Sequence, residues 1–191
     1  MNLSLNAALL VVDVQQGFHD PRWGERNNPC AESNITRLLN AWRAQRMPVI
    51  HVQHDSLAAD GAFRPGTPGN RPKPEAMPLD GESVHRKTVN SAFIGTRLEE
   101  ELRTRRIRSL VIVGLTTNHC VSTTTRMAGN LGFDTYLVSD ACARFARPTL
   151  DGRPRTAEGV HAAALSDLDG EFATVLDTPA VLAALFQETT P

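Results

Sequence analysis

The feature that most limits the fold of this chain is a series of short apolar runs separated by helix-length segments. Residues 7–14 (AALLVVDV) and 108–115 (RSLVIVGL) have apolar centres with no polar residue alternating through them. Such runs are typical of strands buried on both faces, as in a parallel sheet covered by helices. The expected strands are 7–14, 48–53, 83–87, 108–115, 133–139 and 171–176. The expected helices are 31–46, 96–106, 118–131, 156–168 and 178–187.

Strands that alternate with helices predict the α/β class, and crossovers of this length are right-handed. We therefore expect a three-layer αβα sandwich around a six-stranded parallel sheet, Rossmann-like, with strand order 3-2-1-4-5-6. The length of 191 residues suits one domain, which we expect to span residues 1–191. Residues 55–82 contain five prolines and four glycines without helical or alternating periodicity. This long loop is expected to form a lid or a pocket wall.

The charge balance limits the partners of the chain. Twenty Lys and Arg residues against 21 Asp and Glu residues leave a formal net charge of −1, which argues against nucleic acid or an anionic membrane as partner. No apolar run is long enough to span a bilayer, and the first residues lack the features of a signal peptide. Three cysteines do not make a disulfide framework, so a reducing, cytoplasmic location is expected. Cys30 and Cys142 are expected to be structural.

Reactive side chains follow three of the expected strands. Asp13 ends the first strand, Lys87 ends the third, and Thr116–Cys120 follow the fourth. In open parallel sheets, sites lie beyond the carboxyl ends of the strands, so these residues are expected at a common edge. Lys87 is one of only two lysines, the other being Lys73. Lysine can exchange a proton near neutral pH, which arginine cannot.

Cys120 is the candidate nucleophile at this edge. A helix N-terminus favours thiolate over thiol, and its free N–H groups can hold the oxyanion of an attacked carbonyl. Asp13 could accept the thiol proton, and Lys87 would hold Asp13 ionised and lower the pKa of the thiol. An inert, small core cysteine is the alternative, and position alone does not decide between the two.

Three motifs in order carry a resemblance to a known family. DVQQGF (13–18), KTVNSAF (87–93) and GLTTNHCV (114–121) resemble the isochorismatase-like cysteine hydrolases, which include nicotinamidases, carbamoyl-amide hydrolases and isochorismatases. The resemblance covers nearly the whole chain and implies a catalytic triad of Asp13, Lys87 and Cys120. It also implies a cis peptide between Leu115 and Thr116, which would direct the N–H groups of Thr116 and Cys120 at the substrate oxygen. Homo-oligomers, a small-molecule substrate and no cofactor are further expectations.

The reaction implied by the resemblance is C–N hydrolysis of a small amide or ureido compound. Cys120 would attack the carbonyl, the amine would leave, and water would hydrolyse the thioester. Family members that cleave the enol ether of isochorismate without a covalent step need no thiol at this position, so the cysteine favours an amidase. The residues expected to contact substrate are Gln15, Phe18, Trp23, Phe93, Thr117 and His119. Core packing is the alternative for the three aromatic residues.

Histidines near the expected site could form a Cys–His pair or a metal site. His119 adjoins Cys120, but neighbours on a helix point about 100° apart, so a shared proton is disfavoured. A metal site at His51, His54 and Asp55 is also disfavoured, because the loop up to residue 82 lacks the further histidine of nicotinamidases. His51 and His54 should moreover face opposite sides of their strand. We expect no metal.

Two alternatives to an amidase remain. One is hydrolysis of the isochorismate enol ether, which would persist after replacement of Cys120 by Ala. The other is a binding protein that keeps the fold without catalysis. Rapid labelling of one cysteine at neutral pH would favour an activated thiolate over this second alternative.

Overall fold

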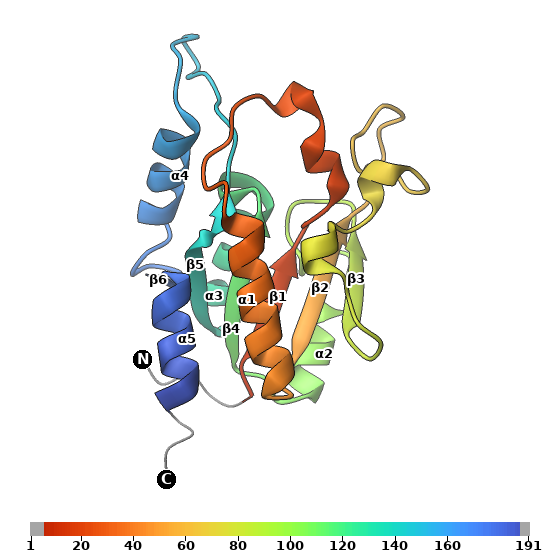
Figure 1. Ribbon diagram of the computed structural model, residues 1–191, viewed down its shortest axis with the longest axis vertical. Helices are drawn as coiled ribbons and strands as arrows, with labels where there is room; N and C mark the ends of the chain where they lie inside the picture. The colour runs from red at the N-terminus through yellow and green to blue at the C-terminus, as the bar shows by residue number, and fades with distance from the viewer. Residues whose placement is uncertain (1–5, 188–191) are drawn as a thin grey trace.

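The computed structural model describes residues 6–187, and its centre is a six-stranded parallel sheet (Figure 1). The strands are β1 (Ala8–Val12), β2 (Val49–His54), β3 (Ser83–Lys87), β4 (Ser109–Leu115), β5 (Asp134–Ala143) and β6 (Thr174–Leu176). Their order in the sheet is β3-β2-β1-β4-β5-β6, and every neighbouring pair is parallel. The predicted α/β class and strand order are confirmed.

Helices cover both faces of the sheet. The helices are α1 (Ala31–Ala44), α2 (Leu98–Thr104), α3 (Ser122–Asn130), α4 (Ala157–Ser166) and α5 (Thr178–Gln187). α1 and α5 lie on one face and α2 and α3 on the other, whereas α4 packs beside the segment that leads into α3 (Figure 1). This arrangement makes the three expected layers.

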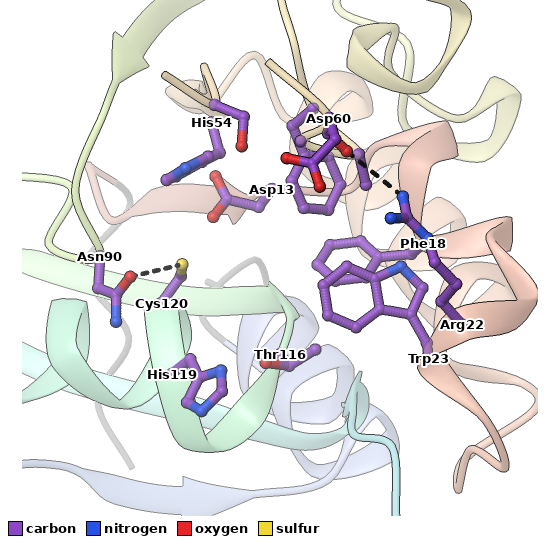
Figure 2. A pocket seen from close by; sticks show the side chains of 14 residues that line it. Asp13, Phe18, Arg22, Trp23, His54, Asp60, Asn90, Thr116, His119 and Cys120 are labelled. Atoms are coloured by element: carbon purple, nitrogen blue, oxygen red, sulfur yellow. Dashed lines mark hydrogen bonds between the residues drawn. The ribbon is translucent and has the colours of Figure 1, made fainter. Parts of the chain in front are cut away.

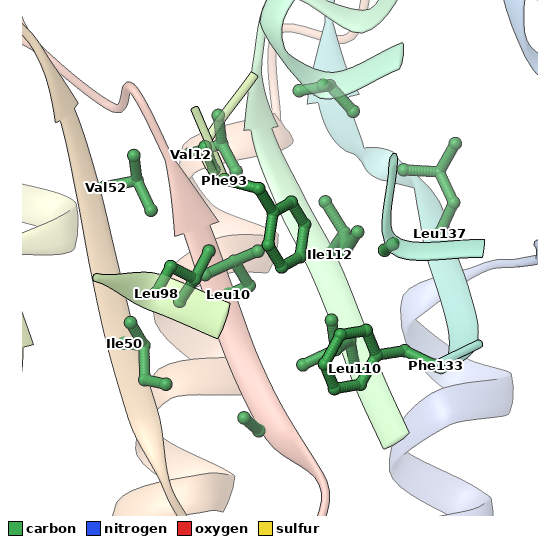
Figure 3. Close-up of a cluster of buried hydrophobic side chains, with 14 of the residues drawn as sticks. Leu10, Val12, Ile50, Val52, Phe93, Leu98, Leu110, Ile112, Phe133 and Leu137 are labelled. Carbon is green, nitrogen blue, oxygen red and sulfur yellow. The ribbon is translucent and has the colours of Figure 1, made fainter. Parts of the chain in front are cut away.

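The central strands β1 and β4 are buried along their whole length because both faces of the sheet are covered there. Along β1, Leu9 and Val11 belong to the core under α1 and α5. Leu10 and Val12 belong to the core under α2 and α3, shown in Figure 3. The unbroken apolar run therefore serves two separate cores.

Element ends differ from the prediction where the chain forms irregular turns. The expected helix 118–131 starts as a π-helical turn, Thr117–Val121, before α3. The expected strand 171–176 shortens to β6, because residues 171–172 form a turn and Ala173 makes only an isolated bridge to Asp169. The segment after β1 forms two short 3₁₀ turns, Gln16–His19 and Pro21–Trp23, which no periodicity marks.

None of the helices within residues 6–187 has the length and the apolar composition that crossing a membrane would require.

Candidate active site

The structure brings the ends of β1, β3 and β4 together around one cavity (Figure 2). The Lys87 ammonium donates to Asp13 Oδ2 at 2.6 Å, and both side chains are buried. The Cys120 sulfur lies on the cavity wall, where a carboxylate oxygen of Asp13, a ring nitrogen of His54 and this sulfur are all within 4.8 Å of one another. The three residues implied by the sequence motifs therefore share one site.

One carboxylate oxygen of Asp13 accepts a hydrogen bond, and the other has no partner among residues 6–187. Oδ2 accepts from Lys87, whereas Oδ1 is buried and has no hydrogen-bond partner among residues 6–187. Burial raises the pKa of Asp13, and the charge of Lys87 opposes that rise. The residue sits at φ 53°, in the left-handed region, directly after β1. Its free oxygen can accept a proton without breaking the hydrogen bond from Lys87 to Oδ2.

His54 is a site residue that sequence reasoning considered only as a metal ligand. Its Nδ1 accepts from the Lys87 ammonium at 3.3 Å, so the lysine bridges His54 and Asp13. Burial and then the positive charge of Lys87 lower the pKa of His54, which keeps the ring neutral. The expected strand order could have predicted this position, because it places β2 between β1 and β3. In the structure, His54 pairs with Lys87 across the sheet.

Cys120 lies in the π-helical turn that opens the helix after β4. Its thiol donates weakly to Asn90 Oδ1 at 3.8 Å, and Asn90 also lines the cavity. Burial and the negative charge of Asp13 raise the pKa of the thiol to about 12, although Lys87 opposes the rise. The expected lowering of this pKa is therefore wrong, because removal of the sulfur from water outweighs the nearby ammonium. Cys120 rests as a thiol beside a base.

The segment between β4 and the π-helical turn places a free donor at the cavity. The Leu115–Thr116 peptide is cis, and Thr116 lines the cavity. Within residues 6–187 the Thr116 N–H donates no hydrogen bond, so it is free to bind a ligand oxygen. Gly114 has φ 133°, and a Cβ there would lie 2.0 Å from the Val12 carbonyl oxygen. Only glycine permits this close approach of β4 to β1.

Aromatic side chains form the far wall of the cavity, whose volume is about 470 Å³. Phe18, Trp23 and Phe63 pack together with ring centroids 4.7–6.1 Å apart. Phe18 and Trp23 lie side by side in Figure 2. The Trp23 Nε1 donates to the Gly17 carbonyl at 2.8 Å, so the indole presents an apolar face to the cavity. Phe63 comes from the loop 55–82, which therefore supplies a pocket wall as expected.

Three residues expected to contact substrate lie elsewhere. Phe93 stacks on Phe133 in the core under α2 and α3, because the chain turns inward after β3. The buried Gln15 amide binds the backbone of His54 and the Asn70 carbonyl, which fixes the loop rather than a ligand. Thr117, the first residue of the π-helical turn, is buried, and its hydroxyl lies 2.8 Å from His161 Nδ1. Phe18, Trp23 and His119 do line the cavity.

The histidines near the site do not supply a nicotinamidase-type metal set. His51 Nε2 lies 2.9 Å from a Glu82 oxygen, on the opposite side of β2 from His54. The Nδ1 atom of His54 already accepts from Lys87. Asp55 pairs with Arg86. Because His51 Nε2, His54 Nδ1 and the Asp55 carboxylate have protein partners, these residues do not form the metal-ligand set of nicotinamidases.

The sequence and the fold of the chain are similar to those of known proteins. Residues 7–180 match the sequence model of the isochorismatase family, described as the isochorismatase domain. YrdC of Bacillus subtilis, an isochorismatase family protein, is 50% identical over 171 residues, which cover 90% of this chain and 91% of that protein. A crystal structure of a hydrolase of this family from Chromobacterium violaceum has a TM-score of 0.94 and 47% identity, and covers 96% of this chain and 95% of that chain.

More distant relatives have named activities. Nicotinamidase 3 of Arabidopsis thaliana is 27% identical and covers 90% of this chain and 84% of its own length. The ureidoacrylate amidohydrolase of Agrobacterium fabrum is 31% identical, with 57% of this chain and 60% of that protein covered. Relatives of this chain are thus hydrolases that include amidases.

Proposed function

Because the chain belongs to the isochorismatase family, we propose that it is a cysteine hydrolase that cleaves a C–N bond of a small amide or ureido compound. The observation that carries this proposal is the free Oδ1 of Asp13 beside the Cys120 sulfur, in a cavity that is open to a small molecule. The amide hydrolases among the named relatives support the bond type.

The first half of the reaction transfers the acyl group to sulfur. Asp13 Oδ1 takes the proton of Cys120, and the sulfur attacks the carbonyl carbon while the oxygen becomes an oxyanion. The free N–H of Thr116 and the N–H of Cys120 bind that oxyanion. The C–N bond then breaks, the amine leaves with the proton held by Asp13, and an acyl thioester remains on Cys120.

The second half regenerates the thiol. Asp13 takes a proton from water as the water oxygen attacks the thioester carbon. The C–S bond breaks, and the proton held by Asp13 passes to the departing sulfur, which releases the carboxylic acid. Lys87 keeps its hydrogen bond to Asp13 Oδ2 in both halves, and its positive charge compensates the negative charge as it moves between Asp13 and the substrate oxyanion. A resting thiol fits this scheme because the proton leaves only during attack.

A screen for ammonia release tests the proposal. Primary amides and carbamoyl compounds of two to eight carbon atoms, roughly the size that such a cavity accepts, are incubated with the wild type and with Cys120→Ala. We expect release by the wild type and none by the variant, with the same thermal unfolding midpoint for both. Full activity of Cys120→Ala would contradict the assignment of Cys120 as the nucleophile. Turnover of isochorismate by this variant would favour enol-ether hydrolysis. No turnover of any compound would favour a binding protein.

A further inference from the structure

One end of the cavity is built from aromatic rings that have no protein cation over them. Phe18, Trp23 and Phe63 form this aromatic wall, and their rings contact one another. The cation–π contacts within residues 6–187 lie elsewhere, at Phe133 and Phe172. The face of an aromatic ring attracts a cation, most strongly for tryptophan. The aromatic wall can therefore stabilise a positive group of a ligand.

An uncompensated carboxylate lies at the same end of the cavity. Asp60 lines the cavity, and within residues 6–187 its carboxylate forms no hydrogen bond and no salt bridge. Arg22 pairs with Asp20 at 2.8 Å and contacts Asp60 only at the backbone carbonyl oxygen, at 3.5 Å (Figure 2). Arg64 of the same loop donates to the Ala59 carbonyl and does not line the cavity. Arg22 thus lies between two carboxylates and compensates the charge of one.

The loop that carries Asp60 is packed closely on the segment after β1. A Cβ at Gly17 would lie 2.5 Å from the Ala62 carbonyl oxygen and 2.8 Å from the Phe63 ring, so only glycine permits this contact. The Phe63 carbonyl accepts a hydrogen bond from the side-chain amide of Asn70 at 2.7 Å. Only two residues separate Asp60 from Phe63. These contacts hold the Asp60 carboxylate near the aromatic wall.

The remaining charges at the cavity are balanced or lie outside it. Asp13 pairs with Lys87. Burial lowers the pKa of His54 and of His119, so both rings are neutral near pH 7. The two arginines that also lower the pKa of His119 do not line the cavity, and Figure 2 shows His119 and Asp60 on different sides of it. One negative charge is therefore left in the lining, at the end that Asp60 shares with the aromatic wall.

We propose that Asp60 and the aromatic wall bind a cationic group of the substrate, which makes small alkylammonium amides the preferred substrate class. The rings replace part of the hydration of the ammonium group, and the Asp60 carboxylate supplies the opposite charge. A cavity of about 470 Å³ has room for an amide at Cys120 and an ammonium group a few carbon atoms away. This inference rests on the proposed function for the amide and goes beyond it for the cation.

Two amides of the same shape test the site. The amide of γ-butyrobetaine ends in a trimethylammonium group, and its carbon analogue ends in a tert-butyl group. A wall that is only apolar would favour the carbon analogue, because the ammonium group loses more hydration on binding. For the wild type we expect kcat/KM to be about tenfold or more higher for the cationic amide. An equal or reversed preference would overturn the inference and leave the proposed function standing.

Variants in one loop locate the effect. Asp60→Asn should reduce the ratio of the two kcat/KM values at least about fivefold, because it removes the charge beside the aromatic wall. Asp80→Asn is the matched control, since Asp80 is an exposed aspartate of the same loop that does not line the cavity. It removes the same charge from the molecule and should leave the ratio unchanged. An unchanged ratio in Asp60→Asn, or an equal fall in both variants, would contradict the site.

Titration calorimetry separates this inference from the proposed function, which the screen for ammonia release decides by itself. Where neither of the two amides is hydrolysed, their binding to the unmodified protein decides the inference. Tighter binding of the cationic amide than of its carbon analogue, lost in Asp60→Asn, would support the cation site. Equal binding, tighter binding of the carbon analogue, or binding of neither compound would overturn it.

Discussion

The two lysines of the chain allow a matched test of one residue. Lys87 and Lys73 are both buried, and each donates to a carboxylate at 2.6 Å, Lys87 to Asp13 and Lys73 to Glu32. Lys87→Met should reduce kcat/KM by about 100-fold or more, because the buried base loses its counter-charge. Activity per folded molecule, with the folded fraction taken from urea unfolding, is the measurement.

The control is Lys73→Met. Each substitution removes a positive charge that compensates the negative charge of a buried carboxylate. Each should therefore lower the free energy of unfolding by about 3 kcal/mol. Activity per folded molecule should fall only in Lys87→Met. Equal losses of activity per folded molecule in the two variants would contradict a specific role of Lys87 as the counter-charge of Asp13.

The raised thiol pKa of Cys120 leads to a second prediction at the residue scale. With a pKa of about 12, the thiolate fraction at pH 7–8 is far smaller than for an ordinary cysteine, and it increases up to strongly alkaline pH. Iodoacetamide reacts with the thiolate, so the labelling rate of Cys120 should still be increasing at pH 9. Peptide mass spectrometry follows Cys120 separately from the exposed Cys30.

A labelling rate that reaches its plateau below pH 8 would contradict this prediction. Such a result would indicate a standing thiolate, as the helix N-terminus alone had suggested. Slow labelling is compatible with catalysis, because Asp13 removes the proton during attack. Thiol reactivity therefore does not separate an enzyme from a binding protein here, and turnover does.

Among the elements, β4 depends on Gly114. Gly114→Ala would place a Cβ 2.0 Å from the Val12 carbonyl oxygen, so β4 and β1 would have to separate. We expect a loss of at least about 3 kcal/mol in the free energy of unfolding, and loss of activity because Thr116 moves. Gly132→Ala is the control, since Gly132 also has positive φ, 80°, but nothing lies within 4 Å of its Cβ position. That variant should lose only about 1 kcal/mol, measured by urea unfolding.

The elements also show what the sequence could and could not predict. Asp13 and Lys87 could be placed because each ends a strand, and the rule for parallel sheets brings such ends together. Phe93 could not, because it follows its strand by six residues and its direction depends on tertiary packing against Phe133. Regular elements carry a period in the sequence, whereas the turns that aim individual side chains do not.

For the same reason, the sequence did not predict the position of Phe63 in the pocket wall or the raised pKa of the Cys120 thiol. Phe63 comes from a loop without periodicity, so nothing in the sequence indicated that it would pack on Phe18. The pKa of Cys120 depends on its burial, which spacing along the chain does not reveal. His54 was within reach, because the predicted strand order already placed its strand between those of Asp13 and Lys87.

Across the whole molecule, charged side chains attach the long loop 55–82 to α1. Glu32 at the start of α1 binds Lys73 and Arg26, and Arg43 near its end binds Glu82. Burial opposes ionisation of Glu32, but the hydrogen bonds from Arg26 and Lys73 prevail and lower its pKa from 4.5 to about 2. The ionised form of Glu32 is therefore the one that stabilises the fold.

The sign of the resulting pH dependence follows from linkage. Between pH 4.5 and 2 the unfolded chain binds a proton at Glu32 that the folded chain does not, so this contribution to stability is complete above pH 4.5 and is lost toward pH 2. Glu32→Gln should lower the free energy of unfolding by about 2 kcal/mol at pH 7, and the difference from the wild type should shrink as the pH falls from 4.5 to 3. Urea unfolding across this pH range measures the difference.

The control is Glu99→Gln, at an exposed pair with Arg103, which should change the free energy of unfolding by less than about 0.5 kcal/mol. A Glu32→Gln difference that is constant from pH 7 to 3 would show that the carboxylate charge does not hold this loop to α1.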